Sequence, residues 1–116
     1  MQYMMLIYVD ERLEEGRSEE EAQKIFEAYT RLDEELKAKN KVISAAALQP
    51  TSTATTIKVR QGKILTTDGP FAEVKEQFGG YYIIECENLD EAIEWAAKIP
   101  DAAHGTIEIR PKMVWG

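Results

Sequence analysis

Two stretches of this chain are apolar on both of the faces that a β-strand would present, and this constrains the fold most. In residues 3–9 and again in residues 81–86, bulky apolar side chains occupy odd and even positions alike. Alternate residues of a strand point to opposite faces of the sheet. Strands of this kind are typical of a sheet that is covered on both sides. The fold therefore has to supply two covers.

Two amphipathic helices are predicted, and Ser18 and Asn88 begin them. Each is followed three residues later by a glutamate, Glu21 or Glu91, which is the spacing of a capping box. Apolar residues then recur every three or four positions. The first stripe is Ala22, Ile25, Phe26, Tyr29, Leu32 and Leu36, before a stop at Asn40, and the second is Leu89, Ala92, Ile93, Ala96 and Ala97, before Pro100. Residues 10–17 are predicted to be a charged loop.

Further strands are predicted at residues 42–48, 55–60, 63–67 and 106–110, with a two-residue turn at Gln61-Gly62. Residues 44–47 also have good helix propensity, but the stretch is short and lies between a helix stop and Pro50. The order is β-α-β, a hairpin, then β-α-β. It predicts one α+β domain over residues 1–116, a ferredoxin-like split β-α-β sheet with an inserted hairpin. Helices would cover one face of five or six strands.

The second face of that sheet has no predicted cover within the chain. An apolar patch of that size is rare on a soluble monomer. We therefore expect a homodimer in which the same face of a second copy supplies the cover. Two stacked sheets enclose a layer about 10 Å thick. Small side chains at residues 44–47 and at Gly79-Gly80 are expected to leave room there for a ligand.

Composition restricts the classes of partner. The net charge of −7 argues against nucleic-acid and membrane partners. With a single cysteine, Cys86, and a single histidine, His104, neither an intrachain disulfide nor a His/Cys metal site is expected. Only a carboxylate site for a hard cation stays open. No cofactor is expected, and the absence of a basic leader at the start of the sequence favours a cytoplasmic protein.

The segment of residues 67–76 is the main candidate for chemistry, because it is longer and more charged than a hairpin connection requires. Asp68 could act as a general acid or base if burial or a neighbouring charge moved its pKa. Alternatively, it hydrogen-bonds the backbone of its own Asp-Gly-Pro turn. Phe71 could line a pocket or anchor the loop on the core. Lys75 could hold a ligand anion or form a surface ion pair.

The last predicted strand carries further candidates. Ile107 and Ile109 share one face, which we assign to the helix side, so Glu108 and Arg110 point to the second face. There they could bind a ligand or form an ion pair with each other. Tyr8 could bring its hydroxyl into the same space. Cys86 is predicted to be an inert buried thiol and His104 a surface residue.

These features together resemble the YCII-related superfamily, and in particular its DGPF subfamily. The resemblance is carried by Asp68-Gly69-Pro70-Phe71-Ala72-Glu73-Val74-Lys75-Glu76, Phe78-Gly79-Gly80-Tyr81-Tyr82, Leu89-Asp90-Glu91-Ala92-Ile93-Glu94-Trp95-Ala96 and Ile107-Glu108-Ile109-Arg110-Pro111. It implies a ferredoxin-like fold in a dimeric α-β barrel. Some members of the superfamily are thought to use a His–Asp pair, whose aspartate aligns with Asp68. The first predicted helix of this chain contains no histidine.

Two functions are therefore expected as alternatives. In the first, the protein is a small-molecule enzyme or ligand-binding protein with a pocket at the dimer interface. Asp68 would be its acid or base, and Arg110 or Lys75 would hold a small anionic molecule. In the second, it is a non-catalytic dimeric regulator or interaction module. The resemblance links that alternative to extracytoplasmic-function sigma factors.

Overall fold

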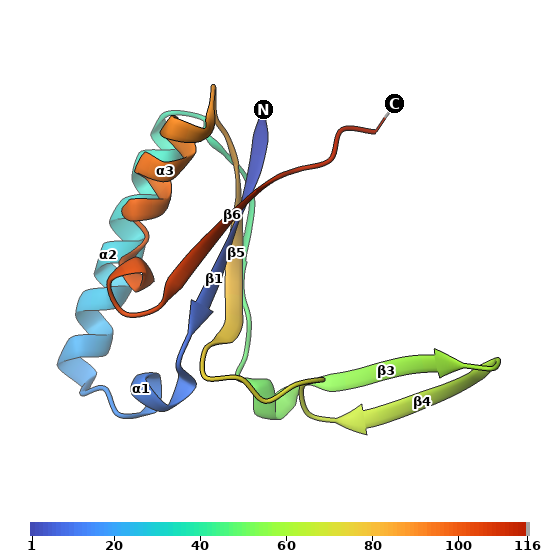
Figure 1. Ribbon diagram of the computed structural model, residues 1–116. Coiled ribbons are helices and arrows are strands. Elements are labelled where there is room, and N and C mark those ends of the chain that lie inside the picture. The colour runs from blue at the N-terminus through green and yellow to red at the C-terminus, as the bar shows by residue number, and fades with distance from the viewer. Residues whose placement is uncertain (116) are drawn as a thin grey trace.

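The computed structural model describes residues 1–115 of the chain (Figure 1). Its main sheet is antiparallel, with strand order β2-β5-β1-β6. The elements are β1 (Gln2–Val9), α1 (Glu11–Glu15), α2 (Glu19–Ala38), β2 (Val42–Ala47), the 3-10 turn η1 (Thr51–Thr53), β3 (Thr55–Arg60), β4 (Lys63–Asp68), β5 (Gln77–Glu85), α3 (Leu89–Ala97), η2 (Pro100–Ala103) and β6 (Thr106–Pro111). The fold is α+β, as predicted.

The hydrophobic core lies between the main sheet and helices α2 and α3, which cover the same face (Figure 1). Burial alternates strictly along β1, as a strand with one face on the core requires. Leu32 and Leu36 of α2 and Trp95 of α3 pack against this face. Ile107 and Ile109 of β6 also pack against the core, which confirms the face assigned to them from the sequence.

The predicted hairpin exists but does not belong to the main sheet. β3 and β4 form a separate two-stranded sheet joined at Gln61-Gly62, where both residues have positive φ, at 50° and 75°. We call residues 55–68 the arm. The expectation of a sheet with five or six strands is therefore wrong: four strands form the main sheet of residues 1–115. The arm projects on the side away from the helices (Figure 1).

Other corrections concern local structure. Residues 10–17 contain α1, because the Asp10 carboxylate accepts a hydrogen bond from the Arg12 backbone amide and starts a short helix. Gly79 and Gly80 lie inside β5 instead of preceding it. In α3 Ala92 and Ala96 of the predicted stripe are buried and so is Trp95, whereas Leu89 and Ile93 of the stripe are half exposed. The nine residues of α3 make too short a helix for spacing alone to fix its buried face.

The main sheet has a second face that no helix of residues 1–115 covers (Figure 1). We call it the open face. Met4, Leu6 and Tyr8 of β1 alternate with the core residues, and Tyr81 and Ile83 of β5 lie opposite them. These side chains are only partly shielded from solvent. The prediction that both faces of the central strands are apolar, with helices on one face alone, is confirmed.

The helices can also be compared with the requirements for a membrane-spanning segment. Within residues 1–115, none of the helices combines the length and the apolar character that crossing a bilayer needs.

The start of β6 depends on a close backbone approach at Gly105. A Cβ atom at this position would clash with the carbonyl oxygen of Tyr8 on β1. The Gly105 amide also donates to the carbonyl oxygen of Asp101 at 2.7 Å, which closes η2 against the strand. Glycine is therefore required where the chain turns from η2 into the edge strand.

We expect Gly105→Ala to destabilise the protein by about 2–3 kcal/mol, because the added methyl group must push β6 away from β1. Gly16→Ala is the control, since a Cβ there would meet its nearest atom, the Arg12 carbonyl oxygen, at 3.6 Å. Its effect should stay within about 1 kcal/mol. Urea unfolding followed by circular dichroism measures both. Equal stabilities of the two variants would contradict the close approach.

Glu91 ties the start of α3 to the rest of the domain. Its carboxylate receives the Lys41 ammonium at 2.8 Å, the Glu87 backbone amide at 2.8 Å and the Trp95 indole N–H at 3.1 Å. The Lys41 hydrogen bond, together with the Glu87 amide and Trp95, lowers the pKa of Glu91 from 4.5 to about 2. The folded chain therefore holds this carboxyl ionised more firmly than the unfolded chain does.

Glu91→Gln should therefore cost stability in a pH-dependent way. The stabilisation from ionised Glu91 is fully present above pH 4.5 and is lost as the pH falls toward 2. Melting temperatures of variant and wild type should differ most at pH 6–7 and converge at about pH 2–3. Glu94→Gln, on the exposed side of the same helix, is the control and should show no such convergence. A constant difference across this pH range would refute the Glu91 network.

Candidate functional site

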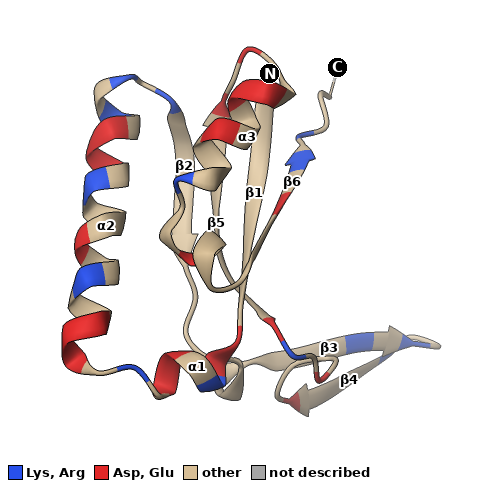
Figure 2. Cartoon of the chain, turned by 60° about the vertical axis from the view of Figure 1, so that its left-hand side comes forward, with Lys and Arg blue, Asp and Glu red and all other residues tan. Residues whose placement is uncertain are grey.

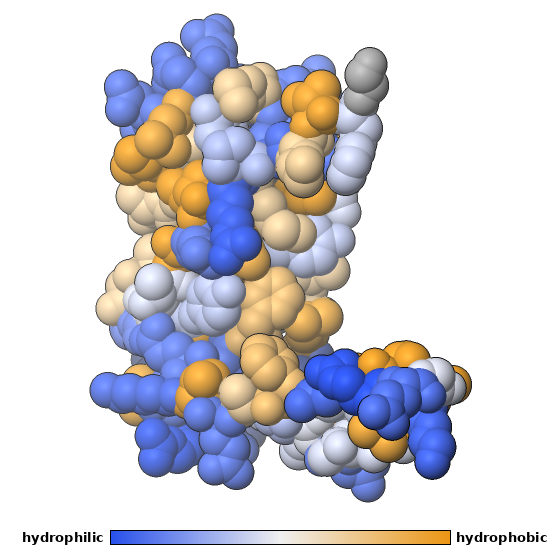
Figure 3. Space-filling view, turned by 45° about the vertical axis from the view of Figure 1, so that its right-hand side comes forward, coloured by the Kyte–Doolittle hydropathy of each residue, from blue (hydrophilic) through white to orange (hydrophobic). Residues whose placement is uncertain are grey.

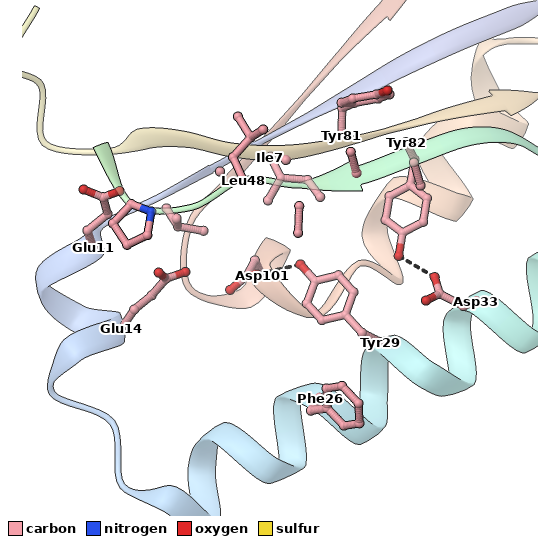
Figure 4. A pocket seen from close by; sticks show the side chains of 17 residues that line it. Ile7, Glu11, Glu14, Phe26, Tyr29, Asp33, Leu48, Tyr81, Tyr82 and Asp101 are labelled. Carbon is pink, nitrogen blue, oxygen red and sulfur yellow. Dashed lines mark hydrogen bonds between the residues drawn. The ribbon is translucent and has the colours of Figure 1, made fainter. Parts of the chain in front are cut away.

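A cavity of about 510 Å³ lies between the middle of α2 and the main sheet (Figure 4). We call it the helix–sheet cavity. Its sheet wall is built mainly from small residues, the run Ala45–Ala47 of β2 and Gly79 and Gly80 of β5. A Cβ at Gly80 would lie 2.7 Å from the Ala46 carbonyl oxygen, so glycine permits the pairing of β2 with β5. Because these wall residues are small, the part of α2 that lies opposite them does not contact the sheet closely.

For this reason, the burial of the apolar stripe of α2 differs along the helix. Its second half is packed on the core through Leu32 and Leu36. In its first half, Phe26 is 66% exposed although it belongs to the apolar stripe, and it lines the cavity with Tyr29. The small residues 45–47 and Gly79-Gly80 thus leave room on the helix side of the sheet, where the sequence did not predict a cavity. The room expected between the stacked sheets of a homodimer stays a prediction.

Two tyrosine–carboxylate pairs cross the cavity (Figure 4). The Tyr29 hydroxyl donates to Asp101 Oδ2 at 2.5 Å, and the Tyr82 hydroxyl donates to Asp33 Oδ1 at 2.6 Å. Burial, followed by the hydrogen bond to Asp101, raises the pKa of Tyr29 far above its usual value of 10.0. Burial and the Asp33 hydrogen bond raise the pKa of Tyr82 in the same way. Both phenols therefore stay protonated and act as fixed donors.

The cavity is negatively charged. Besides Asp33 and Asp101 it is lined by Glu11 and Glu14, whereas the Arg17 guanidinium lies 3.5 Å from Asp101 Oδ1. Burial, and after it the neighbouring Asp101 carboxylate, raises the pKa of Glu14. Four carboxylates near one guanidinium on an otherwise apolar wall favour a ligand with a positive charge or several hydrogen-bond donors.

Glu11 lines this cavity and forms hydrogen bonds that join neighbouring segments of the chain. Its carboxylate accepts the Thr51 backbone amide at 2.8 Å and the Thr51 hydroxyl at 2.6 Å. Its own backbone amide donates to the Gln77 side chain at 3.0 Å. These hydrogen bonds join α1, η1 and the start of β5, three segments that are distant in the sequence.

Three of the predicted site residues come together elsewhere, at the edge of the open face. Tyr8, Glu108 and Arg110 line a shallow hollow with Glu76 and Thr106. The Tyr8 hydroxyl donates to Glu108 Oε1 at 3.3 Å, and Arg110 pairs with Glu108 Oε2 at 3.4 Å. Burial, and next the Glu108 charge, raises the pKa of Tyr8. The mutual ion pair of Glu108 and Arg110 was one of the two predicted readings, and it is confirmed.

The other predicted site residues do not line the helix–sheet cavity or the hollow at Tyr8. Asp68 is the last residue of β4, exposed and opposite Thr55. Phe71 is 86% exposed, so the alternative that it anchors the loop on the core is wrong for the single chain. Lys75 is also exposed. The structure does not bring these three residues to Tyr8, Glu108 and Arg110 within one chain, and their proposed roles stay predictions.

The remaining sulfur and imidazole groups lie where the sequence placed them. Cys86 is buried, and burial raises the pKa of its thiol, as expected of an inert core residue. His104 is exposed directly after η2. In the described part of the chain, no three His, Cys, Asp or Glu side chains gather as metal ligands.

Sequence reasoning missed Tyr29, Asp33 and Asp101 as site residues. The sequence pattern identifies Tyr29 only as a member of the apolar stripe of α2. Its spacing of four from Asp33 could have indicated a polar pair on one helix face. Asp101 follows Pro100 in a segment that was regarded only as a helix stop, and nothing in the local sequence indicates that it is buried.

Comparison with known proteins finds similarity over the whole chain. A family model described as YCII-related domain matches residues 1–116. An uncharacterised protein of Rhizobium meliloti (strain 1021) is 35% identical over 113 residues, which cover 96% of this chain and 91% of the relative.

Proposed function

This chain belongs to the YCII-related family, and on that premise we propose that it is a homodimeric protein that binds a small organic cation in the helix–sheet cavity. The observation that carries this proposal is the cavity of about 510 Å³, with its apolar wall and the carboxylates that line it. Ligand sites in proteins typically combine an apolar lining with a few placed polar groups. The best matching ligand is an amine with a flat apolar body.

The polar groups suit such a ligand in a specific way. The hydroxyls of Tyr29 and Tyr82 donate hydrogen bonds to Asp101 and Asp33, so these carboxylates are held in place before a ligand binds. A fixed acceptor costs less to organise on binding than a mobile one. An ammonium group could then bind the remaining lone pairs of Asp33, and its apolar body could pack against residues 45–47.

The homodimer is supported by the open face. Met4, Leu6 and Ile83 project from the central strands with no cover inside the chain as described by residues 1–115. The strand order and the helices after β1 and β5 support a ferredoxin-like arrangement, in which sheets of two copies would stack as a dimeric α-β barrel. The Asp-Gly-Pro-Phe segment supports assignment to the DGPF subfamily. The earlier prediction of an anionic ligand concerned Arg110 and Lys75, outside the helix–sheet cavity.

The ligand class is tested with two probes of similar shape and opposite charge, tryptamine and indole-3-acetate. Isothermal titration at 0.15 M salt should show binding of tryptamine only. Asp33→Asn keeps an acceptor for Tyr82 but removes the charge, and should weaken tryptamine binding by about threefold to tenfold. Glu34→Gln removes the neighbouring charge on the exposed side of α2 and should leave binding unchanged. Equal affinities for the two probes would contradict a cation site.

The homodimer is tested by placing a charge on the open face. Leu6→Glu should convert a dimer into a monomer in sedimentation equilibrium at about 10 μM, because each copy would bury an unpaired carboxylate. Leu13→Glu on α1, where the wild-type leucine is 57% exposed, is the control and should stay dimeric. Circular dichroism verifies that both variants fold. A wild-type monomer at this concentration would refute the dimer.

A further inference from the structure

The arm is a β-ribbon without a core of its own. Apart from its own strand pairing, it packs extensively against no helix or strand of residues 1–115. Its apolar side chains are largely exposed, with Ile64 at 71% and Ile57 at 62%. An isolated two-stranded hairpin is at best marginally stable in water. The arm therefore needs an external surface to pack on.

The two faces of the arm differ in kind. The register pairs Ile57 with Thr66, Val59 with Ile64 and Thr55 with Asp68, so these six residues share one face. We call it the apolar arm face. The opposite face carries Lys58, Arg60 and Lys63, with Leu65 between them. The apolar arm face is therefore suited to packing against an apolar surface. The basic side chains are suited to ion pairs with an acidic surface.

The body of the same protein offers an acidic surface. The chain has a net charge of −7 although the arm contributes three cations and one carboxylate. Carboxylates gather at the end of the domain from which the arm leaves, on α1 and at the start of α2 (Figure 2). We call this the acidic corner, and its residues are Glu14, Glu15, Glu19, Glu20 and Glu21. The basic arm and the acidic corner are complementary in charge.

The arm is long enough to reach that corner on a second copy. Six residues per strand span about 20 Å, whereas two stacked sheets lie only about 10 Å apart. The arm leaves on the side of the open face (Figure 1). A radius of gyration of 16.3 Å, against about 13 Å for a compact chain of this length, reflects this projection. An arm of this length would pass the sheet of its partner and end beside the partner's helices.

We propose that the arm clasps a second copy of this chain, with the apolar arm face packed on the partner and with Arg60 and Lys63 at its acidic corner. This inference rests on the homodimer proposed above. The space-filling view shows hydrophobic side chains on both the arm and the body (Figure 3). Asp68 lies at the base of the apolar arm face, so the same interface encloses it. The exposed position of Asp68 is then a property of the single chain alone.

The test compares two adjacent residues of β4 that point to opposite faces. Ile64→Ser removes an apolar group from the apolar arm face, and Leu65→Ser removes one from the basic face. Because each change occurs twice per dimer, Ile64→Ser should raise the dimer Kd by about 100-fold. Leu65→Ser should change it by less than about threefold. Sedimentation equilibrium of the full chain measures both constants.

A second variant removes the arm altogether. The Gly69 amide donates to the Ala54 carbonyl oxygen at 2.7 Å, so the arm is closed at its base. Replacing residues 55–68 with Asn-Gly should leave the circular dichroism of the body intact and weaken the dimer by at least as much as Ile64→Ser. If this shortened chain unfolds, the Ile64→Ser and Leu65→Ser pair decides alone.

The charge contact is tested by reversal and restoration. Arg60→Glu with Lys63→Glu should raise the Kd about tenfold or more at low salt and less at high salt. Adding Glu15→Lys and Glu19→Lys to the same chain should restore the dimer. Failure of this restoration would overturn the placement of the arm at the acidic corner.

The outcomes separate the clasp from the dimer itself. If Leu6→Glu abolishes the dimer while Ile64→Ser and arm removal leave the Kd unchanged, the homodimer stands and the clasp is wrong. If Leu65→Ser weakens the dimer as much as Ile64→Ser, the assigned packing face is wrong and the clasp fails with it. A monomeric wild type overturns both proposals.

Discussion

The structure depends on the burial of one face of β1 and β5 under two helices. Met5, Leu36 and Ile84 are almost completely buried in that layer, and the apolar area removed from water there is the main source of stability. The same strands carry bulky apolar side chains on their opposite face, because successive residues alternate. Helices of the same chain therefore bury one apolar face of the sheet, whereas the open face has no cover within residues 1–115. The arm leaves the domain on this uncovered side (Figure 1).

The helix–sheet cavity follows from a packing mismatch within the satisfied layer. Where β2 and β5 carry alanine and glycine, the sheet surface recedes and α2 cannot fill the gap with Phe26. Tyrosine hydroxyls extend across the gap and bind carboxylates, so the space is bounded by fixed polar groups. Two separate tyrosine–carboxylate pairs, from Tyr29 and Tyr82, span a single space. The position of the cavity is thus set by side-chain volume, and its charge by carboxylates of α1, α2 and η2.

Much of the fold could be predicted from local patterns. Capping by Ser18 and Asn88, the turn at Gln61-Gly62 and the alternation of residues 3–9 each depend on neighbours within a few residues, and the structure confirms them. The site was predicted less well, because Asp101 and Tyr29 lie 72 residues apart and meet only through the packing of η2 against α2. The helix–sheet cavity was not predicted for a similar reason: small residues predict room but not on which side of a sheet it opens.

The arm has one consequence for how this domain can change. At its root, a backbone hydrogen bond from the Gly69 amide to the Ala54 carbonyl oxygen joins the two ends of the arm. Insertions at the tip of the arm therefore leave the rest of the fold undisturbed. A strand repeats every two residues. Inserting an even number of residues into each strand at the root of the arm keeps its apolar and basic faces in place, whereas an odd number exchanges them and presents lysine and arginine where isoleucine and valine were. Among related chains, arms that are lengthened at the root should therefore differ by two residues per strand.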